Sequence, residues 1–460
     1  MTDPRTVLPD FSKKSEVDRV MEEADTHGVS RRDVLKLASF ASLTIAGGSL
    51  LAACGSDSSS SSSSVTAADG TAAAPSGSTV IADNSGKLAF LIMTNQLEYD
   101  VLMSDAADLV GKQFGYSYTG LNGELDAQLQ LSQFNQVAAA GTKAVMLHSP
   151  DGSNVRPISQ AAEQQQIYWA NVWGTLPWFT PYEAGDYWTL YAQPDEFLVQ
   201  GEATRVLAEA IGGEGEIVRV TGVQGNTADI IRSAGADAAL EDFPDVKLVG
   251  ELSGNWNAED SQKAMESLLS KYPDAKGAIA QNDDEATGVI AAIKAAGKVP
   301  GKDILVTGAD GTDLAAERIN SGEQLVTTAN IPAYAGYFLV TRLYDVQNGW
   351  KPKAPERMLQ WKSIILTKEN IDPYLARYVD SDAEPFNAKL LSHVESPDNW
   401  DMQVDMYPMD LDVLWTNIKK PAGWKNPPAY QQAVDSGEME KVAAEYKQHY
   451  KADILGPVPS

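Results

Sequence analysis

Short apolar runs alternate with amphipathic stretches of helix length along the chain from residue 87 onward. Seven runs of five or six residues predict strands, over 88–93, 144–148, 167–172, 216–221, 247–251, 277–281 and 304–308. The stretches between them predict helices, over 101–114, 125–140, 196–211, 258–271 and 285–296. Because strands that alternate with helices form a parallel sheet covered on both faces, the pattern predicts an α/β fold with more than one small sheet.

Polar residues stand directly after most of the predicted strands. Ligands of doubly wound sheets bind at the carboxyl ends of the strands, so these positions are candidates for a binding site. They are Thr94, Asn95, Gln96, Ser149, Asp151, Gln224, Asn226, Asn282, Asp283, Asp284 and Asp310. The same residue types cap helices and form turns, so each position also has a purely structural interpretation.

The first 53 residues have the parts of an export signal. A polar leader precedes Arg31 and Arg32, and this pair with the apolar residues after it resembles a twin-arginine signal. Residues 37–53 carry no charge, but a stretch of 17 residues with several Gly, Ser and Thr is short for a transmembrane helix. We therefore expect a twin-arginine lipoprotein signal peptide over 1–53.

That segment ends in Leu51-Ala52-Ala53-Cys54, which resembles a bacterial lipobox, and Cys54 is the only cysteine of the chain. The resemblance implies lipidation of Cys54 by a thioether-linked diacylglycerol, which anchors a protein without a membrane-spanning helix. Residues 54–79 are rich in Ser, Ala, Gly and Thr and are expected to form a flexible tether. The protein would then lie outside the cytoplasm, lipid-anchored to the outer face of the cell membrane or in the periplasm.

Composition and missing motifs exclude several function classes. A formal net charge of −27 argues against a nucleic-acid partner, which needs a concentrated positive surface. No Gly-rich phosphate loop ending in Gly-Lys-Ser or Gly-Lys-Thr occurs. The histidines outside the leader, His148, His393 and His449, accompany no nucleophile motif and no zinc-binding pattern. We expect no catalytic residue, no metal site and no cofactor.

Three segments, in order along the chain, resemble the ribose-type periplasmic binding proteins of ABC importers: residues 278–288, 305–312 and 325–332. Weaker similarity extends over residues 87–366. The resemblance implies two doubly wound parallel-sheet lobes joined by a three-crossover hinge, the type I periplasmic-binding-protein fold, with a C-terminal extension.

The implied division of the chain is an N-lobe over 80–193 with 331–359, a C-lobe over 194–330 with 360–366, and a C-terminal extension over 367–460. The crossovers are expected near 193–195, 330–332 and Gln360. The extension has a globular composition and a helix candidate over 435–449, so it is expected to pack on a lobe or around the hinge.

The resemblance also implies ligand contacts. Asn282, Asp310 and Asn330 match family residues that hold the sugar, and Trp256 stands where the family places an aromatic ring over it. Further candidate contacts are Asn95, Gln96, Tyr99, Asn171, Trp173, Gln224, Asn226 and Arg232.

The sequence departs from the family pattern in three places. Residues 171–174 replace an Asp-Arg pair that grips sugar hydroxyls, and Gln96 and Tyr99 stand near the place of paired aromatics in the first strand. Arg232 matches the nearer arginine of the family pattern, which leaves Ile230 at the position that should face the ligand.

An aromatic-rich stretch over 168–191 has no parallel in the ribose pattern. Trp169 is expected in the core, whereas Trp173 and Trp178, in the loop after the strand, are expected to face the cleft. A slot of this kind suits a small polyol, a deoxy or modified sugar, or a partly aromatic solute, and the sequence does not choose among them.

These features predict a monomeric, non-enzymatic substrate-binding lipoprotein of an ABC importer. It would capture a sugar or sugar-like polyol by hinge closure and deliver it to a membrane permease and its ATPase subunits. Two alternatives remain open: a ligand-sensing receptor for a membrane kinase or chemoreceptor, and a receptor for a non-sugar, aromatic solute. Neighbouring permease genes or a neighbouring kinase gene would separate transport from sensing.

Overall fold

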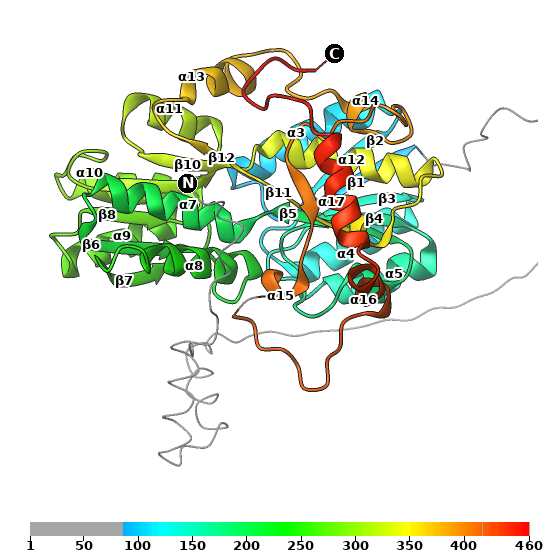
Figure 1. The fold of residues 1–460 in the computed structure, drawn as a ribbon, viewed down its shortest axis with the longest axis horizontal. Coiled ribbons are helices and arrows are strands. Elements are labelled where there is room, and N and C mark those ends of the chain that lie inside the picture. The colour runs from blue at the N-terminus through cyan, green and yellow to red at the C-terminus, as the bar shows by residue number, and fades with distance from the viewer. Residues whose placement is uncertain (1–85, 416, 460) are drawn as a thin grey trace, which may run out of the picture. The chain divides into compact units, whose positions relative to one another are not determined.

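The computed structural model describes residues 86–415 and 417–459 (Figure 1). The expectations for the signal peptide, for Cys54 and for the tether lie outside this part of the chain. Every helix in the described part is too short or too polar to cross a membrane.

The N-lobe is built on a seven-stranded sheet. Its strands, in spatial order, are β13 (Met406–Pro408), β11 (Met358–Trp361), β5 (Trp188–Pro194), β4 (Tyr168–Val172), β3 (Ala144–His148), β1 (Lys87–Ile92) and β2 (Ser117–Asn122). Neighbouring strands are parallel, except that β13 runs antiparallel to β11. The edge strand β13 comes from the C-terminal segment of the chain.

Helices cover both faces of the N-lobe sheet. They are α3 (Glu98–Gln113), α4 (Ala127–Ala139), α5 (Val155–Gln165), the short α6 (Pro181–Ala184) and α12 (Pro332–Gln347). Successive residues of a strand point to opposite faces. Accordingly, Phe90 of β1 belongs to the hydrophobic cluster of α3 and α12, whereas the adjacent Leu91 belongs to the cluster of α4 and α5.

The C-lobe is built on a six-stranded sheet. Its strands, in spatial order, are β12 (Ile364–Leu366), β10 (Val326–Ala329), β9 (Leu305–Asp310), β8 (Gly277–Ala280), β6 (Glu214–Thr221) and β7 (Asp245–Ser253). Neighbours are parallel except β12 and β10. Its helices are α7 (Glu196–Ala210), α8 (Thr227–Leu240), α9 (Ala258–Lys271), α10 (Asp283–Ala295) and α11 (Asp313–Ser321), with α7 paired to α8 and α9 paired to α10.

The described chain passes between the lobes at three points: from β5 to α7, from β10 to α12 and from β11 to β12. Two parallel-sheet lobes of this kind confirm the predicted α/β fold class. All seven predicted strands are present, with ends that differ by at most two residues from the prediction. The apolar pattern missed β2, β5, β11 and β13 of the N-lobe sheet and β10 and β12 of the C-lobe sheet.

Residues beyond β12 touch both lobes. They form α13 (Ile371–Tyr374), the π-helical turn η3 (Leu375–Val379), α14 (Ala388–Leu391), β13, α15 (Leu411–Leu414), α16 (Pro428–Asp435) and α17 (Glu438–Gln448). Strand β13 extends the N-lobe sheet, and α13 packs against α11 of the C-lobe (Figure 1). Tyr407 donates a hydrogen bond of 2.6 Å to Oδ2 of Asp195, at the first crossover.

Helices α7 and α8 lie close together because glycines face each other between them. A Cβ atom on Gly235 would lie 2.1 Å from the carbonyl oxygen of Phe197, and one on Gly201 would lie 3.2 Å from the carbonyl oxygen of Gly235. The close approach brings Glu196, the first residue of α7, into an ion pair with Arg232 on α8.

Replacing Gly235 by alanine should force these helices apart. An added Cβ in a packed interface costs about 1–3 kcal/mol, which outweighs the gain of about 0.5–1 kcal/mol that alanine brings to a helix. Urea unfolding should show this loss. In the control variant Gly111→Ala in α3, the new Cβ meets the flexible end of Leu88 at 3.2 Å and the Cβ of Tyr116 at an ordinary contact distance of 3.7 Å. Equal stability of Gly235→Ala and wild type would contradict the close packing.

Candidate functional site

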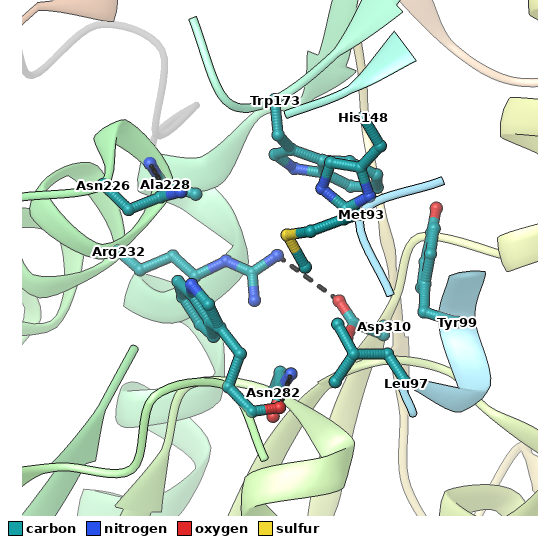
Figure 2. A pocket seen from close by; sticks show the side chains of 11 residues that line it. Met93, Leu97, Tyr99, His148, Trp173, Asn226, Ala228, Arg232, Asn282 and Asp310 are labelled. Atoms are coloured by element: carbon teal, nitrogen blue, oxygen red, sulfur yellow. Dashed lines mark hydrogen bonds and ion pairs between the residues drawn. The ribbon is translucent and has the colours of Figure 1, made fainter. Parts of the chain in front are cut away.

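A small cavity lies between the carboxyl ends of the two sheets, with a free volume of about 40 Å³. A single water molecule needs about 10–15 Å³ of such space, so the cavity has room for a small solute. It is lined by Met93, Leu97, Tyr99, His148, Trp173, Asn226, Ala228, Arg232, Trp256, Asn282 and Asp310 (Figure 2). Both lobes contribute side chains to its wall.

Arg232 is the central charged group of the cavity. Its guanidinium donates to Glu196 through Nε, to the carbonyl oxygen of Gln281 through Nη1, and to Oδ1 of Asp310 through Nη2 at 3.3 Å (Figure 2). Burial lowers the pKa of Arg232, but the carboxylates of Glu196 and Asp310 more than offset this and raise it. The guanidinium therefore stays charged inside the protein.

Asp310 is held from two sides. Besides Arg232, the side-chain amide of Asn330 donates to Oδ1 of Asp310 at 3.1 Å. Burial raises the pKa of Asp310, while the positive charge of Arg232 opposes the shift. Both of these hydrogen bonds go to Oδ1 of Asp310, and no hydrogen bond to its Oδ2 is found among the described residues, so Oδ2 is available to accept one.

Two indole rings line the cavity from loops with unusual backbone. Trp173 and Trp256 both have left-handed φ values, 43° and 63°. The Nε1 of Trp173 donates to Glu196, and the ring of Trp256 lies 5.4 Å from the guanidinium carbon of Arg232. The Trp256 ring fits because residue 222 is glycine, where a Cβ would lie 2.0 Å from the ring. Strained conformations of this kind concentrate at binding sites.

Asn226 and Asn282 line the cavity and also cap helices. Each side-chain oxygen accepts a backbone N–H in the first turn, of α8 and α10 respectively. The amide nitrogen of Asn226 donates across the lobes to the carbonyl oxygen of Pro150 at 2.7 Å, and that of Asn282 donates to the carbonyl oxygen of Trp256 at 3.3 Å. Both residues therefore cap a helix and also line the cavity.

Five predicted contacts do not reach the cavity wall: Asn95, Gln96, Asn171, Gln224 and Asn330. Asn95, Gln96 and Gln224 are exposed, because the chain turns outward directly after β1 and β6. Asn171 is buried and accepts a hydrogen bond from Nε1 of Trp188. Asn330 contacts Asp310 instead of the cavity, through the hydrogen bond that its side-chain amide donates.

Two further expectations need correction. Trp178 packs against Trp415 and Trp424 of the C-terminal segment, with ring centroids 4.8 Å apart in both pairs, so it does not face the cleft. Arg232 lines the cavity and Ile230 does not, because Arg232 lies on the side of α8 that packs toward Glu196 and Asp310.

The sequence-based prediction missed Met93, Leu97, His148 and Ala228. His148 stands at the end of a predicted strand, which is a signal that the sequence offers. In the structure its Nδ1 lies 2.7 Å from Oδ1 of the buried Asp100. The apolar residues gave no such signal. Within the described part of the chain, no group of three or more His, Cys, Asp or Glu side chains is placed to hold a metal ion.

Carboxylates from both lobes meet beside the cavity. Oε1 of Glu98, at the start of α3, accepts the backbone N–H of Leu314 at 3.3 Å. Burial and the neighbouring Glu98 raise the pKa of Asp284 to about 7, and the same two causes raise that of Asp313 to about 6. Oδ2 of Asp284 is buried without a hydrogen-bond partner among the described residues. Asp284 and Asp313 therefore keep their protons to higher pH than exposed aspartates do.

Asp284→Asn should remove a free-energy cost of folding that grows as the pH rises. A carboxyl whose pKa rises on folding binds its proton more tightly in the folded protein, so the stability it contributes is present near pH 4 and is lost as pH rises through about 7. The variant and wild type should therefore unfold similarly in urea at pH 4.5. At pH 8 the variant should be more stable by about 1–2 kcal/mol.

Asp274→Asn provides the control, because this carboxylate lies exposed in the loop between α9 and β8. It should leave the pH dependence unchanged. A parallel pH dependence in Asp284→Asn and wild type would refute the raised pKa of Asp284.

Comparison with known proteins finds similarity to periplasmic binding proteins. A family described as the periplasmic binding protein domain matches residues 88–351. The chain is 28% identical over 204 residues to the xylitol-binding protein of Mycolicibacterium smegmatis, covering 44% of this chain and 56% of that protein, little more than half of its length. It is 26% identical over 261 residues to the D-apiose import binding protein of Actinobacillus succinogenes, covering 56% of this chain and 81% of that protein.

The fold is also similar to a crystal structure of a twin-arginine translocation pathway signal protein from Burkholderia phytofirmans. The TM-score is 0.62 at 24% identity, over 65% of this chain and 95% of that one.

Proposed function

Because the chain belongs to the periplasmic binding protein domain family, we propose that it captures a sugar or sugar-like polyol between its lobes for import by an ABC transporter. The observation that carries this proposal is the cavity itself, where Arg232 and Asp310 stand beside two indole rings. Charged and amide side chains recognise hydroxyl groups, and indole faces pack on the C–H faces of sugar rings. Relatives that bind xylitol and import D-apiose support a small polyhydroxylated ligand.

Hinge closure would couple binding to transport. Three contacts join the lobes around the cavity: Asn226 to Pro150, Leu314 to Glu98, and Trp173 to Glu196 at the first crossover. A ligand held by both walls binds the closed arrangement better than the open one, and that difference in affinity shifts the population toward closure. A permease that docks only closed receptors would then accept loaded protein. No step of this cycle needs catalysis by the chain.

Export and anchoring are part of the same proposal. The arginine pair at Arg31 and Arg32 would direct the protein out of the cytoplasm in folded form, and a lipid on Cys54 would keep it at the outer face of the membrane. The Ser-rich residues 54–79 would let the lobes reach a permease. This arrangement suits a monomeric receptor that acts beside its transporter.

A thermal-shift panel of sugars, polyols, amino acids and aromatic acids tests the function. A ligand at 100 times its dissociation constant stabilises the folded state by about 2.7 kcal/mol, so at least one sugar or polyol should raise the melting temperature by several degrees. If only amino acids or aromatic acids raised it, or no solute did, the carbohydrate assignment would fail.

Asp310→Ala should abolish that shift, because it removes the free carboxylate oxygen of the cavity and one partner of Arg232. Circular dichroism should report an unchanged fold. Asp274→Ala, at an exposed position, serves as the matched control and should keep the full shift. Ligand affinity retained in Asp310→Ala would contradict this placement of the site.

A further inference from the structure

The two lobes offer walls of different chemistry to the cavity. The C-lobe wall is rich in hydrogen-bonding groups and consists of Asn226, Ala228, Arg232, Trp256, Asn282 and Asp310. The N-lobe wall is mainly apolar and consists of Met93, Leu97, Tyr99, His148 and Trp173. A solute in the cavity therefore meets polar groups on one side and mostly hydrocarbon, sulfur and ring faces on the other.

Hydrogen-bonding groups of both walls already have partners, on the C-lobe side those of Asn226, Arg232 and Asn282. The same holds for two residues of the N-lobe wall. Nε1 of Trp173 donates to Glu196, and Nδ1 of His148 is paired with Asp100 at 2.7 Å. The buried hydroxyl of Tyr99 remains without a partner among the described residues. It points away from Leu97 (Figure 2).

Two other residues of the N-lobe wall are apolar. Met93 and Leu97 line the cavity and are 3% and 5% exposed, and Figure 2 shows Leu97 beside Asp310 and Met93 beside His148 and Trp173. A leucine has no hydrogen-bonding group and a thioether is only a weak acceptor. A ligand hydroxyl placed against this pair would lose its water without a replacement partner, whereas a C–H edge would gain from the contact.

The charged groups at the cavity wall also limit the charge that a ligand can carry. Arg232 already stands between the carboxylates of Glu196 and Asp310, so its positive charge is compensated within the protein. An anionic solute would find no unpaired cation in the cavity wall and would approach two carboxylates. The walls therefore favour an uncharged ligand.

From this asymmetry we propose that the ligand is an uncharged sugar or polyol with one edge free of hydroxyls, as in a deoxy sugar, and that this edge lies against Met93 and Leu97. The proposal rests on the proposed function and names the ligand class of the same site. The hydroxyl-bearing edge faces Asp310, Arg232 and Asn282. An apolar wall of this kind discriminates against an added hydroxyl by about 10- to 100-fold.

Matched pairs that differ by one hydroxyl provide the test. Isothermal titration calorimetry of the purified protein would compare D-fucose with D-galactose, L-rhamnose with L-mannose, and 2-deoxy-D-ribose with D-ribose. In at least one pair the deoxy member should bind about 10- to 100-fold more tightly than its hydroxylated partner.

Two variants test whether Met93 and Leu97 cause the preference for the deoxy sugar. Leu97→Asn and Met93→Gln each place a hydrogen-bonding amide in the apolar part of the N-lobe wall. Each variant should bind the hydroxylated sugar more tightly and so reduce the preference for the deoxy sugar at least tenfold. Leu109→Asn, on the exposed side of α3, should leave the preference unchanged. Using two variants guards against one that fails to fold, which circular dichroism would reveal.

The outcomes separate this inference from the function on which it rests. If the hydroxylated member of every binding pair bound as tightly as the deoxy member or more tightly, the apolar-edge inference would be overturned while the sugar-binding function stood. If no sugar or polyol bound at all, the proposed function would fail and the inference with it.

Discussion

The site depends on one buried cation. Arg232 is almost inaccessible to solvent, and burying an unpaired guanidinium would cost several kcal/mol. Its partners come from three places in the chain: Glu196 at the start of α7, the carbonyl oxygen of Gln281 after β8, and Asp310 at the end of β9. All three must converge for the charge to be tolerated, so Arg232 fixes the first crossover, the helix pair and the central strands of the C-lobe relative to one another.

Backbone geometry supplies what the residue types alone cannot. Trp173, Trp256 and Ile331 have left-handed φ values, and the close approach of Gly222 to the Trp256 ring leaves no room for a Cβ. Each such residue costs of order 1–3 kcal/mol and persists only where its surroundings hold it. The rings that face the cavity are thus held in place by strained loops around them, and neither feature is visible as a pattern of apolar and polar positions.

The sequence predicted the sheets well and the cavity wall in part. Strands with unbroken apolar runs were found, because strands buried on both faces need them. Strand β2 was missed because it lies at a sheet edge and is largely exposed, and β5 because its aromatic residues were assigned to a binding cluster. Asn282 and Asp310, after the central strands β8 and β9, line the cavity, and so does Asn226 after β6. Asn95 and Gln96 after β1 and Gln224 after β6 turn outward. That direction depends on loop conformation, which the residue types leave undetermined.

The C-terminal segment shows how distant parts of the chain maintain the site. Asp283 stabilises the turn that follows Asp310. Its Oδ2 accepts hydrogen bonds from the backbone N–H groups of Gly311 and Thr312 at 2.8 and 3.1 Å. Tyr374, beyond the last C-lobe strand, donates to the carbonyl oxygen of Gly311 at 2.5 Å. Since Tyr407 bonds Asp195 beside Glu196, the same segment braces both carboxylates that enclose Arg232. The added residues therefore stabilise the arrangement that gives the cavity its chemistry, which explains why they pack on both lobes.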